Sequence, residues 1–176
     1  MVRNINIIIG KIANGLASTS WAKVKNLVGL YHGLLALSID PRSKVRKESH
    51  KAIQAFFTHE SGNLSAKRAG KITSKFILSQ FLSENDGSNT NDKSHTIIHL
   101  FNLLSPIISY FPLSISNPII DHSLKLIQSL PSIRRSGFNL FYHLFKSRPT
   151  SINQSILSYV LFFSSSHILS ILFHSL

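Results

Sequence analysis

The stretch IDPRSKVRKESHKAIQAFF, from Ile39 to Phe57, combines five basic side chains with an apolar ending. A helix turns by about 100° per residue, which gathers one set of these side chains on a single, mostly apolar side. Lys44, Lys47 and Lys51 fall on the opposite side. The pattern therefore predicts an amphipathic helix over residues 42–58 with a row of lysines on its outer face. The inward side consists of Val45, Ser49, Ala52, Ile53 and Phe56.

The charge of the whole chain gives this lysine row two interpretations. The 176 residues carry 19 Lys and Arg against 7 Asp and Glu, for a net charge of +12. Residues 1–75 hold 13 of the basic and 3 of the acidic side chains. A row of lysines can be an ordinary solvated helix face. A strongly basic half also attracts nucleic acid, acidic protein or anionic membrane.

Apolar residues recur at helical spacing along most of the chain. The spacing predicts further helices over 21–37, 64–82 and 94–111, the last kinked at Pro106. In the helix over 64–82, Lys67, Lys71 and Lys75 again lie in a row. Asn117 and Pro118 favour the start of a helix that runs to about Leu130, and one further helix follows before residue 149.

These elements divide the chain into three parts. Residues 1–20 form a poorly defined N-terminal segment, residues 21–149 form helical repeats, and residues 150–176 form an apolar, serine-rich helical tail. The polar run at 83–93 is expected to be a disordered loop. The expected helices are joined by short turns, and the sequence contains no convincing strand. We therefore expect an all-α fold: a HEAT-like α-solenoid of about four antiparallel helix pairs.

The turn before the lysine row carries the HEAT pattern. Asp-Pro at Asp40 and Pro41 is followed by Val-Arg at Val45 and Arg46, and then by small and apolar residues. In such arrays, the arginine after the valine commonly bonds an aspartate across repeats. Asp40 and Arg46 are therefore expected to have a structural, inter-repeat role.

Three motifs in order carry a more specific resemblance. They are DPRSKVRKESHKAI, HTIIHLFNLLSPIISYFP and LFYHLFKSRP, within a region of matching order and spacing over residues 21–149. In this order, the chain resembles the ribosomal RNA-processing protein 12 family of HEAT-repeat ribosome-biogenesis factors, as a short or truncated member. Pro106 departs from the family, whose helix continues there, and the tail after Pro149 matches none of its pattern.

The resemblance implies a non-enzymatic scaffold of the nucleus and nucleolus. It implies binding to pre-ribosomal RNA and pre-ribosomal proteins, a link to nuclear transport factors, and neither a cofactor nor a small-molecule substrate. The residues expected to contact RNA or partners, on two lysine rows that could merge into one ridge, are Lys44, Lys47, Lys51, Lys67 and Lys71.

Other functional classes have less support in the sequence. Phosphate-binding glycine loops and nucleophile motifs are absent, and so are cysteines. His95 and His99 are spaced to share a metal, but neither has a further ligand nearby in sequence, so no metal site is expected. An integral membrane protein with spans near 96–120 and 151–176 is the main alternative, since both segments lack charge. No acidic residue precedes Asp40, as in mitochondrial transit peptides, so such a peptide at the N-terminus is a minor alternative.

Overall fold

The computed structural model of the chain describes residues 25–58, 63–83 and 90–148. Regular structure within these ranges is entirely helical. Two short 3-10 turns, η1 (Ile108–Tyr110) and η2 (Pro131–Ile133), precede the last two α-helices. The α-helices are α2 (Lys25–Leu37), α3 (Ser43–Thr58), α4 (Asn63–Leu82), α5 (Thr90–Leu104), α6 (Leu113–Ser129) and α7 (Arg134–Ser147).

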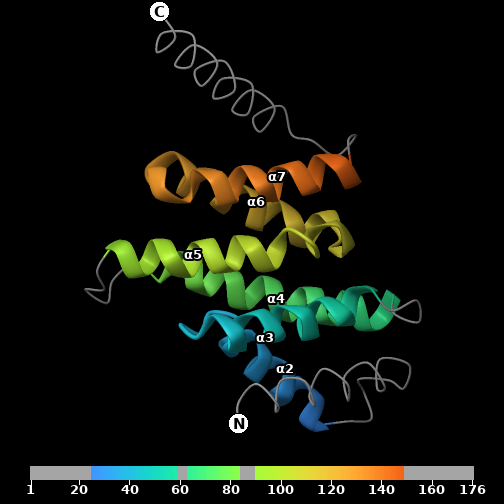
Figure 1. The fold of residues 1–176 in the computed structure, drawn as a ribbon. Helices are drawn as coiled ribbons and strands as arrows, with labels where there is room; N and C mark the ends of the chain where they lie inside the picture. The colour runs from blue at the N-terminus through green and yellow to red at the C-terminus, as the bar shows by residue number, and fades with distance from the viewer. Residues whose placement is uncertain (1–24, 59–62, 84–89, 149–176) are drawn as a thin grey trace, which may run out of the picture.

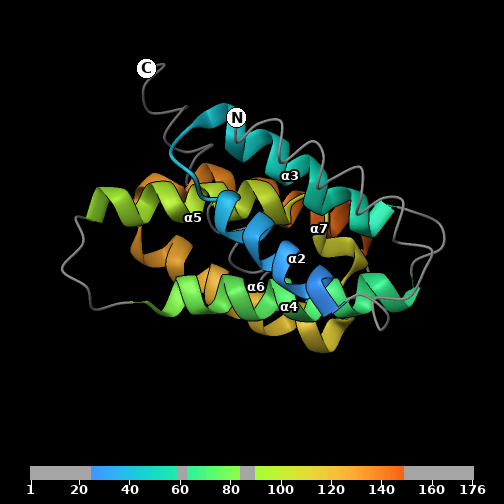
Figure 2. The same cartoon turned by 90° about the horizontal axis from the view of Figure 1, so that it is seen from below.

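In the described part of the chain, the helices form consecutive pairs that follow one another along the molecule (Figure 1). The pairs are α2 with α3, α4 with α5, and α6 with α7. Helix α4 packs against α2 and α6, whereas α5 packs against α7. Seen from below, α3, α5 and α7 lie on one side and α4 and α6 on the other (Figure 2). This stack of helix pairs in two layers confirms the expected α-solenoid.

The expected fourth pair would draw on the tail at 150–176, which lies outside the described residues. Of the loop expected over 83–93, residues 90–93 belong to α5, which begins at Thr90, and residues 84–89 lie outside the described ranges.

The inward side of α3 is the one that the sequence predicts. Its members are all buried, including the polar Ser49. The Ser49 hydroxyl donates a hydrogen bond to the main-chain carbonyl of Leu34 on α2, so burial leaves this polar group satisfied. Helix α3 is thus fixed to α2 by both apolar contact and a hydrogen bond. The buried residues of α3 are Val45, Ser49, Ala52, Ile53, Phe56 and Phe57.

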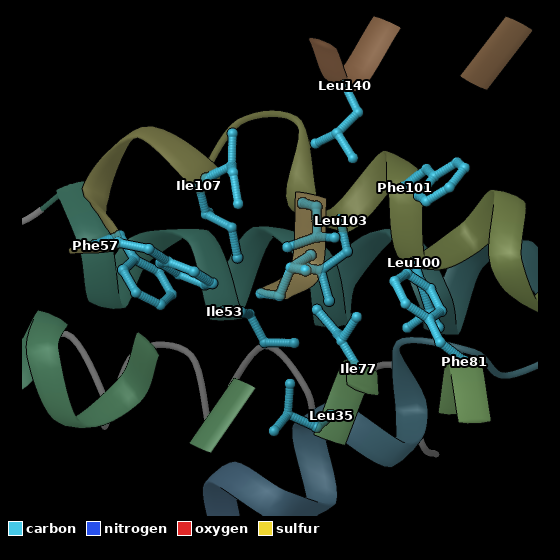
Figure 3. Close-up of a cluster of buried hydrophobic side chains, with 14 of the residues drawn as sticks. Leu35, Ile53, Phe57, Ile77, Phe81, Leu100, Phe101, Leu103, Ile107 and Leu140 are labelled. Carbon is cyan, nitrogen blue, oxygen red and sulfur yellow. The ribbon is translucent and has the colours of Figure 1, made fainter. Parts of the chain in front are cut away.

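One hydrophobic core runs between the two layers (Figure 3). It takes side chains from every α-helix in the described ranges, and most of them are fully buried. Fully burying an aliphatic or phenyl side chain contributes about 1.5–3 kcal/mol, so this shared core holds the helix pairs together. Representative members from α2 to α7, in chain order, are Leu35, Ile53, Ile77, Leu100, Ile127 and Leu140.

A buried hydroxyl pair links α2 to α4. The oxygens of Tyr31 and Thr73 lie 2.7 Å apart, and the Thr73 hydroxyl donates to the carbonyl of Ala69 at 2.8 Å. Since Thr73 has only one hydroxyl proton, the Tyr31 hydroxyl is the donor in the pair. Burial raises the pKa of Tyr31 well above its ordinary value, so this hydroxyl stays protonated.

The kink expected at Pro106 is wrong, because the helix ends before the proline. Helix α5 ends at Leu104, and the Ser105 hydroxyl bonds back to the carbonyl of Phe101 at 2.8 Å. The Ile107 amide then bonds to the carbonyl of Leu104 as the chain enters η1. Proline has no amide proton and clashes with the preceding turn, which favours termination here.

The next helix starts earlier than Asn117. Helix α6 begins at Leu113 with Pro112 as its N-cap residue, so Pro118 lies inside the helix. The amides of Ile115 and Ser116 both bond to the carbonyl of Pro112 and form the first turn. Burial of Ser116 gives this additional turn a place in the core, at the cost of the one hydrogen bond that Pro118 cannot donate.

These helix ends bear on the membrane alternative. The segment 96–120 is divided between α5 and α6, with η1 between them. Among the described residues, every helix is too short or too polar to span a bilayer. The alternative is therefore not favoured over 96–120, and the second proposed span, 151–176, lies outside the described residues.

Candidate nucleic-acid interface

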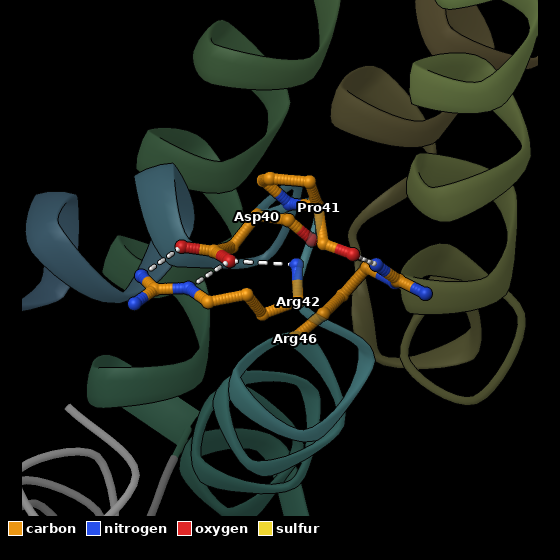
Figure 4. Close-up of polar contacts among 4 residues, drawn as sticks. All are labelled: Asp40, Pro41, Arg42 and Arg46. Carbon is orange, nitrogen blue, oxygen red and sulfur yellow. Dashed lines mark hydrogen bonds and ion pairs between the residues drawn. The ribbon is translucent and has the colours of Figure 1, made fainter. Parts of the chain in front are cut away.

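The turn into α3 is built around the carboxylate of Asp40 (Figure 4). Arg42 donates to it three times: its amide and Nε reach Oδ1 at 2.9 Å each, and Nη2 reaches Oδ2 at 2.7 Å. These bonds from Arg42 hold the pKa of Asp40 down to about 2. The carboxylate therefore stays ionised and positions the first residues of α3.

Arg46 contacts the same turn through main-chain oxygens. Its Nη1 donates to the carbonyl of Asp40 at 2.7 Å and to that of Pro41 at 3.3 Å (Figure 4). The expectation that Arg46 bonds an aspartate across repeats is therefore not met by these contacts. The physical reason is that Arg42 already engages both carboxylate oxygens of Asp40.

Arg46 still influences the neighbouring helix pair. Its positive charge is one of the causes that lower the pKa of His99 on α5. Arg46 thus stabilises the turn before α3 through its hydrogen bonds and acts on His99 of the next helix pair through its charge.

The lysine row of α3 lies on its outer face. Lys44, Lys47 and Lys51 are all exposed. Lys51 forms an ion pair with Glu48, with 3.2 Å between Nζ and Oε1, and such a surface pair is worth at most about 1 kcal/mol. An arriving phosphate can displace a pair this weak, so all three lysines are available to an anionic ligand.

The cations of α4 occupy different surroundings. Lys71 is exposed, and the side chain of Lys67 lies outside the described residues. Lys71 borders a pocket of about 310 Å³ between α2 and α4. The pocket is lined by Val28, Arg68, Lys71, Ile72 and Lys75.

Sequence reasoning did not include Arg68 among the site residues. Its spacing from Lys71 and Lys75 could have placed it on the same side of α4. Its proximity to Val28 on α2 could come only from the fold.

The described lysines of α3 and α4 do not lie on one common ridge. Helices α3 and α4 lie on opposite sides of the stack in Figure 2. Lys71 faces the pocket beside α2, while the row at Lys44, Lys47 and Lys51 covers the outside of α3. The molecule therefore presents two basic surfaces, which we call the α3 face (Lys44, Lys47, Lys51) and the α4 pocket (its five lining residues).

The paired helices and the Asp-Pro turn can be compared with known families. A family model described as RRP12-like, N-terminal HEAT repeats matches residues 8–151. The chain belongs to this family. The match includes all the helices described above and both basic surfaces, and it confirms the resemblance seen in the motifs. Neither the curated proteins nor the solved structures contain a match to the chain. Membership among RRP12-like HEAT repeats suggests a scaffold of ribosome biogenesis.

In this RRP12-like stack, the histidines of α5 are not assembled into a metal site. Within the described ranges, no three His, Cys, Asp or Glu side chains come together as potential ligands. Burial lowers the pKa of His99 to about 4, assisted by the charges of Arg46, His50 and His95. His99 is consequently neutral at physiological pH.

Proposed function

We propose that this chain is a non-enzymatic scaffold of ribosome biogenesis that holds pre-ribosomal RNA on its α3 face. The observation that carries the proposal is the exposed row of Lys44, Lys47 and Lys51 in a chain of the RRP12-like HEAT family. Three cations along one helix face can contact successive phosphates of a backbone. Contacts of this kind position RNA without reading its sequence.

The same proposal includes the partners and the location. Pre-ribosomal proteins, and nuclear transport factors linked to export, are proposed to bind other surfaces of the stack, in the nucleus and nucleolus. Family membership supports this proposal, since assembly of pre-ribosomal particles takes place there. Lys67 and Lys71 are proposed to contact RNA or such partners from α4. A scaffold of this kind needs no cofactor.

A salt titration of RNA affinity tests the α3 face. The variant is Lys44→Gln/Lys47→Gln/Lys51→Gln, assayed with single-stranded RNAs of unrelated sequence. Each phosphate contact to a single strand contributes about 0.7 to the slope of log affinity against log salt, so the slope should flatten by about 2. The affinity should fall by a similar factor for all of the RNAs, because the lost contacts carry no sequence information.

A matched control separates location from net charge. Lys125→Gln/Arg135→Gln/Lys146→Gln removes three exposed cations from α6 and α7. Circular dichroism checks that both variants keep their helical content. Equal slopes for the two triple variants would refute the α3 face, since general charge would then explain binding.

A further inference from the structure

The α4 pocket combines features that RNA-backbone binding does not require. Val28 and Ile72 supply an apolar floor; Val28 is 39% exposed and Ile72 is partly buried against the core. Arg68, Lys71 and Lys75 form the rim, and all three are exposed. Their spacing of three and four residues places them along one side of α4. The pocket is thus an apolar recess edged by three positive charges.

The charge of this rim is not balanced by the pocket itself. None of the five lining residues is acidic. The described carboxylates nearest in sequence, Asp40 and Glu48, bond to Arg42 and Lys51. An anionic partner would therefore meet three cations to which the described lining residues offer no counter-charge.

The apolar floor of the pocket favours a protein over a nucleic acid as the anionic partner. Single-stranded nucleic acid gains its non-electrostatic affinity by stacking bases on aromatic side chains, and the residues described around this pocket include none. Among the same described residues, hydroxyl and amide side chains that could read base edges are also missing. An aliphatic floor is suited to a bulky apolar side chain, the usual anchor of a protein interface. A volume near 310 Å³ can take one such side chain.

Two other occupants are disfavoured by charge. The N-terminal part of this chain, residues 1–24, carries Arg3, Lys11 and Lys23 and no acid. A second copy of the chain carries a net charge of +12, so the long-range field opposes its approach.

We propose that the α4 pocket docks an acidic segment of a partner protein, with one bulky apolar side chain on Val28 and Ile72 and carboxylates on Arg68, Lys71 and Lys75. The inference deepens the proposed function by giving the chemistry of one assembly partner. It does not depend on RNA binding by the α3 face, so the two can fail separately.

Binding of defined probes to the full chain tests this site. The probes are a fluorescein-labelled 12-residue peptide of Asp and Glu with a central Leu-Phe, the same peptide with Ser-Ser at the centre, and a 12-nucleotide poly(U). Fluorescence anisotropy at 0.15 M salt gives each affinity. The Leu-Phe peptide should bind about tenfold more tightly than the Ser-Ser peptide, because only the former fills the apolar floor.

Variants locate the binding. Lys71→Gln/Lys75→Gln should weaken the Leu-Phe peptide by about tenfold, and Val28→Glu should weaken it by at least as much by placing a carboxylate in the floor. The matched control Lys44→Gln/Lys47→Gln removes the same charge from the α3 face and should change peptide affinity less than threefold, while it weakens poly(U).

Each contrary result has a definite meaning. Equal affinity for the two peptides would overturn the apolar anchor, and insensitivity to Val28→Glu would overturn the location. Loss of poly(U) but not of peptide on Lys71→Gln/Lys75→Gln would make this pocket an RNA site instead. Absence of binding by every probe would overturn the proposal outright. A failure confined to poly(U) and the α3 variants would refute RNA binding there and leave the peptide site standing.

Discussion

Gly137 on α7 offers a quantitative test of how closely the last two helix pairs are packed. A Cβ atom at Gly137 would lie 2.2 Å from Cδ1 and 2.4 Å from Cγ1 of Ile127 on α6. Phe101 of α5 lies 3.4 Å away on another side. Both neighbours are fully buried, so neither can move into solvent. The substitution Gly137→Ala must therefore displace packed side chains.

Two opposing effects set the magnitude. Alanine is favoured over glycine inside a helix by about 1 kcal/mol. Overpacking a tight core costs about 1–3 kcal/mol. We expect Gly137→Ala to lower the free energy of unfolding by up to about 2 kcal/mol, because the steric cost exceeds the propensity gain.

The assay is urea unfolding followed by circular dichroism, with two matched variants. Gly33→Ala on α2 has no atom within 4 Å of the new Cβ, so it should raise the free energy of unfolding by about 0.5–1 kcal/mol. In the background Ile127→Ala, which itself costs about 2–5 kcal/mol, the clash is gone and Gly137→Ala should become stabilising. A stabilisation by Gly137→Ala equal to that of Gly33→Ala in the otherwise unchanged chain would refute the close packing of α6 on α7.

Two further predictions concern polar groups that are partly or fully buried, His99 and Tyr31. The pKa of His99 is about 4 in the folded chain, against an ordinary value of 6.5, mainly through burial and also through the charges of Arg46 and His50. The unfolded chain protonates His99 at a higher pH than the folded chain does, so the free energy of unfolding is unaffected by this group above pH 6.5 and falls as the pH is lowered towards 4. Urea unfolding between pH 7 and 4 should show this fall. The variant His99→Gln should make it smaller. Removing the hydroxyl with Tyr31→Phe leaves Thr73 bonded to the carbonyl of Ala69 and should lower the free energy of unfolding by about 1 kcal/mol, so an unchanged urea midpoint would show that the hydroxyl pair adds nothing.

The helices of the fold were predictable where the signal is local. The 3.6-residue period placed Val45, Ile53 and Phe56 inward and Lys47 outward, and the structure agrees for each. The helix ends near Pro106 and Pro118 were harder. Where a helix starts or ends depends on whether the core has room for an additional turn, as it has for the first turn of α6 around Ser116. That room is a property of the packed core and not of the local sequence.

The candidate site was predictable only in part. The exposure of the α3 lysines followed from the helical periodicity, but the hydrogen-bond acceptor of Arg46 did not. The Asp40 carboxylate was the expected acceptor, yet its two oxygens bond to Arg42, which lies closer in sequence. The α4 pocket could not be predicted from the sequence, because Val28 on α2 and Lys71 on α4 come to line one pocket only when the fold brings the two helices together.

The placement of α3 and α4 in opposite layers has a consequence for how the molecule responds to its ligands. The α4 pocket opens between α2 and α4, and one packed helix is about 10 Å across, so the α3 face and the pocket are separated by a distance on the order of 10 Å. The Debye length at physiological salt is about 8 Å, so charge on one face is largely screened from the other. Neutralising the α3 face should then leave the electrostatic attraction of the α4 pocket nearly unchanged. We therefore expect the two proposed anionic ligands, RNA on the α3 face and an acidic segment in the α4 pocket, to bind independently of each other.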